Sequence, residues 1–143
     1  MVDKVSRIKE EVWKYFKDFE DIYLTTCEGG QPRIRPVTLV HLDERFWVLT
    51  GTDNAKVRQI RKNPKVEFCL PIQKKDRRGY VRAAGLAKIT QDRALKSKVA
   101  KHCDFFREYW KGPNDPNYTL LEILIHEIEY VRPEGITAQK FKL

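Results

Sequence analysis

Apolar residues follow two different periods along the chain, and each period predicts a different kind of element. Near the N-terminus they recur three and four positions apart from Val5 to Phe19, which predicts an amphipathic first helix. Asp92 is a suitable N-cap for a second long helix, whose apolar positions show the same spacing as far as Trp110. Pro64 follows a short basic segment, so a third, short helix is expected from Asn54 to Asn63.

Between these helices, short apolar runs with turn residues at their ends predict strands. We expect them at residues 22–27, 33–42, 46–50, 66–70, 80–90 and 118–130. Short links between the first three favour an antiparallel meander. Pro36 cannot donate to a sheet and implies an edge, bulge or split, and Gly85 marks a bulge or a close backbone approach. The fold class we predict is α+β: an antiparallel six-stranded split β-barrel with flanking helices, as a single domain over residues 1–143.

The composition says more about where the protein is located than about what it does. The formal charge of +8 favours anionic partners without choosing among them. There is no run of 18 apolar residues and no apolar signal segment at the N-terminus, so we expect a cytoplasmic protein that does not enter a membrane. Cys27, Cys69 and Cys103 are odd in number and widely spaced, and they form no metal-binding pattern with the histidines. No metal site is expected.

The most informative segment is the junction between the third strand and the short helix, residues 48–57. A helix N-terminus offers free backbone N–H groups and the positive end of the helix dipole. Lys56 adds a full charge there, and Thr50 and Thr52 add neutral donors, which together suit a phosphate monoester. The alternative is an ordinary capped helix with solvated threonines.

The second strand carries two arginines on one face. Arg33 and Arg35 are two positions apart, which places their side chains on the same side of the strand. Like charges in this arrangement destabilise the fold unless they are exposed to solvent or paired with an anion. With the junction at the end of the neighbouring strand, they indicate an anionic ligand lying across both strands.

The ordered series of these features resembles the pyridoxamine 5′-phosphate oxidase-like family of FMN-binding split barrels. The resemblance runs from about residue 10 to about residue 130. The segments that carry it are Thr25-Thr26, Gly30-Gln31-Pro32, Arg35-Pro36-Val37, Thr50-Gly51-Thr52, Lys56-Val57, Ile60-Arg61-Lys62-Asn63-Pro64-Lys65-Val66 and Gly85-Leu86-Ala87.

This resemblance implies a homodimer that binds FMN at the subunit interface and acts as a flavin-dependent oxidoreductase on a small molecule. It implies a phosphate held at the strand–helix turn and by an arginine, a flavin ring over the arginine-bearing strand, and a further contact from a variable loop. The cofactor-binding residues it implies are Arg35, Pro36, Val37, Thr50, Gly51, Thr52, Asn54, Ala55, Lys56 and Tyr80.

The chain departs from the vitamin B6 oxidases of that family. Val40 stands where they carry a lysine, and residues 128–134 lack their Arg-x-His element, so the chain resembles the short, general members. The sequence nominates no catalytic acid or base. Two alternatives stay open: a reductase that uses the deazaflavin F420, and a non-enzymatic protein that binds flavin or haem. Nucleic acid is not expected as a partner, because the basic residues do not gather with aromatics on one strand face.

Overall fold

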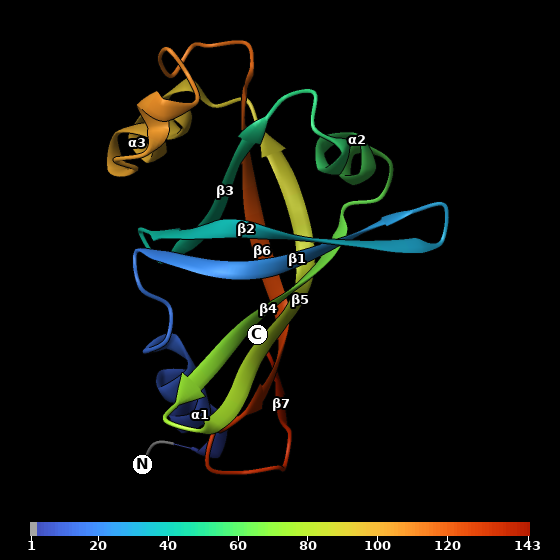
Figure 1. The fold of residues 1–143 in the computed structure, drawn as a ribbon, viewed down its shortest axis with the longest axis vertical. Helices are drawn as coiled ribbons and strands as arrows, with labels where there is room; N and C mark the ends of the chain where they lie inside the picture. Colours follow the sequence, from blue (N-terminus) through green and yellow to red (C-terminus); the bar gives the residue numbers. More distant parts are fainter. Residues whose placement is uncertain (1–2) are drawn as a thin grey trace.

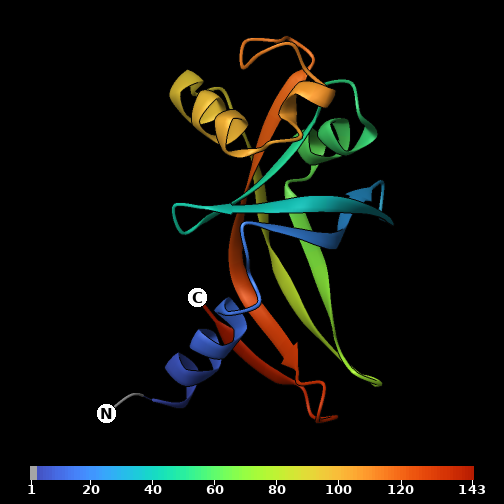
Figure 2. The ribbon, with the colours of Figure 1, turned by 60° about the vertical axis from the view of Figure 1, so that its left-hand side comes forward.

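The computed structural model describes residues 3–143, which form seven strands, three α-helices and one short 3₁₀-helix (Figure 1). In chain order the elements are α1 (Lys4–Trp13), β1 (Phe19–Glu28), β2 (Gln31–Leu42), β3 (Arg45–Gly51), α2 (Ala55–Lys62), β4 (Lys65–Lys74), β5 (Arg77–Thr90), α3 (Arg93–His102), η1 (Phe106–Glu108), β6 (Tyr118–Val131) and β7 (Gln139–Lys142). The helices α2 and α3 lie at one end of the molecule and α1 lies at the other (Figures 1 and 2).

The strands form one antiparallel sheet that closes on itself and is split on one side. Their order is β3-β2-β1-β4-β5-β6-β7, and a further pairing of β3 with β6 completes the ring. β2 pairs with β1 from residue 31 to residue 40, but it pairs with β3 only over residues 40–42. Pro36 lies in the stretch where β2 has a partner on one edge alone, which a residue without an N–H tolerates. The split barrel predicted from the sequence is confirmed.

The largest differences from the sequence prediction are two helix ends and one additional strand. The first helix ends at Trp13, because Phe19 is drawn into β1 opposite Val40, and long-range pairing overrides the helical spacing. The second long helix ends at His102, where Cys103 has an extended backbone with φ of −95° and ψ of 109°. β7 was not predicted: it has four residues with one buried apolar side chain, Phe141, and so shows no period.

Gly85 marks both a bulge and a close approach between β5 and β6. The register of these strands shifts between Ala84 and Gly85. A Cβ atom added to Gly85 would lie 1.9 Å from the backbone oxygen of Leu124, well inside van der Waals contact. Only glycine fits at this point, because the neighbouring strand occupies the space of a side chain.

Two groups of buried side chains hold the elements in place. The larger fills the barrel and includes Leu24, Phe68 and Ile60, so it fixes α2 against β1. The smaller lies under α3 and joins Trp47, Phe106 and Tyr118. Within residues 3–143, no helix has the length and apolar character needed to cross a membrane.

Candidate functional site

The turn from β3 into α2 brings a buried lysine under two neutral acceptors. Lys56 is 9% exposed, and its ammonium donates to Thr50 Oγ1 at 2.8 Å and to Asn54 Oδ1 at 3.2 Å. Val57 and Ile60 are buried beside Lys56 and hold α2 against the barrel, so the lysine lies at the end of the barrel. Asn54 stands at the N-cap but makes no capping bond, so the first turn keeps N–H groups without a side-chain acceptor.

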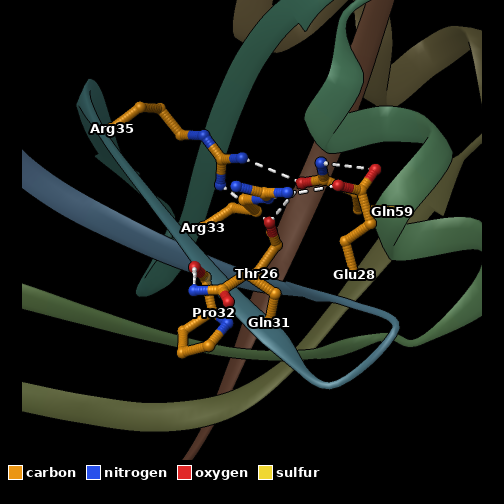
Figure 3. A network of polar contacts seen from close by, with 7 residues as sticks. All are labelled: Thr26, Glu28, Gln31, Pro32, Arg33, Arg35 and Gln59. Atoms are coloured by element: carbon orange, nitrogen blue, oxygen red, sulfur yellow. Dashed lines mark hydrogen bonds and ion pairs between the residues drawn. The ribbon is translucent and has the colours of Figure 1, made fainter.

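Arg35 reaches the same helix from β2. Its guanidinium donates to Thr26 Oγ1 on β1 at 2.9 Å and to Gln59 Oε1 on α2 at 2.9 Å (Figure 3). It also donates to the Leu24 carbonyl oxygen on β1 at 3.3 Å. Gln59 lies three residues after Lys56, so both side chains project from one face of the helix. Arg35 and Lys56 therefore border the same end of the barrel, from facing elements.

Among the described residues, every hydrogen-bond partner of these two cations is neutral. Burial lowers the pKa of Lys56, and the nearby charge of Arg35 lowers it further. Burial also lowers the pKa of Arg35. Two partly desolvated cations that destabilise one another are an unfavourable arrangement in a protein without a counter-charge. Arg35 and Lys56 together therefore have the properties of an anion-binding site.

Arg33 shows the contrast on the same strand face. Its side chain is half exposed and forms an ion pair with Glu28, with 3.1 Å between Nε and Oε1. Of the two arginines that the two-residue period places together, the outer one thus has a carboxylate partner. The inner one, Arg35, has neutral partners only.

The other predicted residues of the turn have more local roles. The Thr52 hydroxyl donates to the Pro116 carbonyl oxygen at 2.7 Å and contacts the Thr119 hydroxyl at 2.8 Å, so it ties the turn to the loop before β6. An added Cβ at Gly51 would lie 2.8 Å from Asn54 Nδ2, the end of a side chain that can move aside. Ala55 is exposed at the start of α2.

The remaining predicted residues lie elsewhere in one chain. Pro36 and Val37 line a groove of about 620 Å³ with Tyr23 and other residues of β1 and β4. Tyr80 is the fourth residue of β5 and so lies next to the β4–β5 hairpin. That hairpin is at the end of the molecule away from α2 (Figure 1). The Tyr80 hydroxyl donates to Glu129 Oε2 at 2.7 Å. The structure thus brings together Arg35, Thr50, Asn54 and Lys56, and it does not bring Tyr80 to them.

Sequence reasoning missed two residues of this site, Thr26 and Gln59. Both are buried and polar, with 0% and 6% exposure. A signal for each was present: Thr26 shares the inward face of its strand with Leu24, and Gln59 is one helical turn after Lys56. Neither type of residue carries a charge, so neither stands out in the sequence as an anion-binding group.

Comparison with known proteins identifies the family of this chain. A family profile described as pyridoxamine 5′-phosphate oxidase matches residues 8–132. The chain therefore belongs to the pyridoxamine 5′-phosphate oxidase family. A comparison with curated proteins found no match.

Solved structures of several proteins share the fold. General stress protein 26 from Bacillus anthracis str. Sterne is 26% identical, with a TM-score of 0.77 over 96% of this chain and 99% of that one. A pyridoxamine 5′-phosphate oxidase-related, FMN binding protein from Nostoc punctiforme PCC 73102 is 16% identical, with a TM-score of 0.71 over 98% and 89%. A heme binding protein from Mycobacterium smegmatis is 14% identical, with a TM-score of 0.71 over 86% of this chain and 53% of that one.

Proposed function

We infer that this protein binds FMN at the interface of a homodimer and acts as a flavin-dependent oxidoreductase on a small molecule. The observation that carries the proposal is the pair Arg35 and Lys56, two desolvated cations with neutral partners only. A phosphate monoester carries about −1.5 to −2 charges at pH 7 and accepts several charge-assisted hydrogen bonds, so it offsets both cations. The Nostoc relative, described as FMN binding, supports the same ligand.

The open edge of β2 supports a place for the flavin ring. From residue 31 to residue 39, β2 pairs with β1 but not with β3, so N–H and C=O groups on its other edge have no strand partner. Pro36 and Val37 lie within this stretch, next to Arg35. Backbone groups at an open edge suit the polar rim of a flavin. The bound flavin would supply the redox chemistry, and the chain would bind and orient it.

An exposed apolar surface supports the homodimer. Tyr23 and Ile34 on the β1–β2 hairpin are 47% and 68% exposed, and Phe19 at the start of β1 is 37% exposed. Large apolar side chains that gather on a strand pair are typical of a surface that a partner covers. Tyr80, which lies far from Lys56 within one chain, would approach a flavin only from the second subunit.

The test is gel filtration of the purified protein with FMN, followed by light scattering and absorbance. We expect a mass of twice 16.9 kDa that carries a flavin band, with one flavin per chain. Riboflavin, which has the same ring system and no phosphate, should bind more weakly. A protein that elutes without flavin from saturating FMN would contradict the proposal.

Repeating the experiment with F420 and with haem separates the alternatives. Retention of F420 in place of FMN would indicate a deazaflavin-dependent reductase, and a haem band would indicate a haem-binding protein like the Mycobacterium relative. The ring of His41, a residue type that can ligate haem iron, stacks on Phe46 at 4.6 Å, and its Nδ1 lies 3.0 Å from the Phe16 carbonyl oxygen. Its Nε2 is buried in the chain, so the ring is not open to a haem. Among these ligands, the two cations favour FMN, because they suit a phosphate monoester.

FMN affinity should depend on pH through Lys56. In the protein without ligand, burial and the charge of Arg35 lower the pKa of Lys56. A bound phosphate would favour the charged ammonium and so raise this pKa. The affinity for FMN should therefore fall as pH rises through the pKa of Lys56 in the ligand-free protein, and this fall should begin below the ordinary lysine value of about 10.4. Titrations from about pH 7.5 upward, where the phosphate stays dianionic, would measure this. Riboflavin affinity should show no such fall, and an equal fall for both ligands would rule out Lys56 as the cause.

A further inference from the structure

The buried amide of Gln59 closes a ring of hydrogen bonds around the Arg35 guanidinium. One guanidinium nitrogen of Arg35 donates to Thr26 Oγ1 at 2.9 Å, and the other donates to Gln59 Oε1 at 2.9 Å. The Thr26 hydroxyl donates to the same Gln59 oxygen at 2.5 Å. The three side chains come from β1, β2 and α2 and point toward one another (Figure 3). The ring fixes the plane of the guanidinium, because each of its members is held by the other two.

The environment of Gln59 dictates which way its amide points. The oxygen Oε1 faces two donors, and Nε2 lies 3.4 Å from a carboxylate oxygen of Glu28. The reverse orientation would place NH₂ against the guanidinium and oxygen against the carboxylate, leaving donors facing donors and acceptors facing acceptors. The position thus requires an acceptor on one side and a donor on the other. An amide meets both needs without any charge.

A carboxylate at this position would have the same shape and a different effect. It would form an ion pair with Arg35 in a buried setting, so an incoming anion would compete with a carboxylate that the chain itself supplies. The site would then contain one compensated cation, Arg35, and one free cation, Lys56, in place of two free ones.

We propose that Gln59 is a positioning residue that gives this site its preference for a phosphate monoester, by orienting Arg35 while leaving its charge uncompensated. The inference rests on the FMN binding proposed above and goes beyond it by naming the residue that sets the selectivity. Gln59 acts through Arg35 and need not touch the ligand. Its effect therefore falls on the phosphate and not on the flavin ring.

The experiment compares FMN and riboflavin affinities, by fluorescence titration, for the wild-type protein, Gln59→Glu and Gln59→Leu. We expect Gln59→Glu to raise the dissociation constant for FMN by at least about tenfold, and that for riboflavin by less than about threefold. Gln59→Leu should weaken FMN binding less than Gln59→Glu does, because Arg35 loses an acceptor but keeps its charge free. The matched control is Gln139→Glu on β7, which makes the same change in net charge away from the site and should leave both affinities unchanged.

The two ligands and the two variants together test the inference. If Gln59 served only to hold the fold, each variant would lower the affinities for FMN and riboflavin alike, because glutamate places an oxygen against Glu28 and leucine leaves Arg35 without an acceptor. That result, or a weaker effect on FMN from Gln59→Glu than from Gln59→Leu, would overturn the inference, even where the wild-type protein prefers FMN. A wild-type protein that binds neither ligand would overturn the proposed function itself, and this inference with it. Thermal unfolding of each variant shows whether a loss of binding reflects a loss of folded protein.

Discussion

Replacing Lys56 with methionine is expected to lower the affinity for FMN by about 1.5–3 kcal/mol, roughly ten- to a hundredfold, as for other hydrogen bonds to charged groups. Methionine keeps most of the unbranched stem and removes the ammonium that lies beside Thr50 and Asn54. The change therefore removes the charge with little change in packing. Calorimetric or fluorescence titration with FMN measures the effect, and riboflavin affinity should hardly change.

The matched control for this variant is Lys101→Met on α3, an exposed lysine with no ion-pair partner among the described residues. It makes the same change in net charge and should leave FMN binding intact. Folding of Lys56→Met should not suffer much, because burial already disfavours the charged lysine in the folded protein. A folded Lys56→Met protein that binds FMN as tightly as the wild type would mean that the β3–α2 turn is an ordinary helix start and not a phosphate-binding site.

The largest expected effect on stability comes from Gly85→Ala. The added Cβ would lie 1.9 Å from the Leu124 carbonyl oxygen. The Cβ is fixed to the backbone of β5 and the oxygen belongs to the backbone of β6, and these strands are paired, so neither atom can move aside alone. We expect the free energy of unfolding to fall by more than about 2 kcal/mol, at the upper end of overpacking substitutions. The midpoint of urea or thermal unfolding would show this.

Gly112→Ala serves as the control for that substitution. An added Cβ at Gly112 meets no atom within 4 Å, and this glycine has no positive φ. The same chemical change should therefore leave stability within about 0.5 kcal/mol of the wild type. Equal stability of the two variants would mean that β5 and β6 can separate at the bulge without cost.

The local pattern of the chain predicted much of the fold because it reports short-range physics. Pro36 indicated a strand with a free edge, and the structure has β2 paired on one side there. Gly85 indicated a bulge or close approach, and both occur. The predicted C-terminal ends of α1 and α3 were wrong, since Phe19 and Phe106 continue the helical spacing but pack through contacts with distant strands. Periodicity cannot distinguish a longer helix from a turn that returns the next apolar side chain to the core.

The site divides in the same way. Lys56 and Arg35 were predicted because a cation at a helix start and a pair of arginines on one strand face are visible in a single segment. Thr26 and Gln59 are ordinary polar residues in their own segments, 33 positions apart, and they acquire a role only where α2 packs on β1.

The sequence by itself determined the split barrel, the strand–helix turn and the positions of Arg35 and Lys56 on β2 and α2. The reason is that sterics, side-chain period and charge can be read from short segments of the chain. Only the tertiary structure decided that Arg33 is paired with Glu28 while Arg35 is not, and that a buried amide orients Arg35. The physical reason is that desolvation and hydrogen-bond satisfaction depend on which groups are brought together from distant parts of the chain.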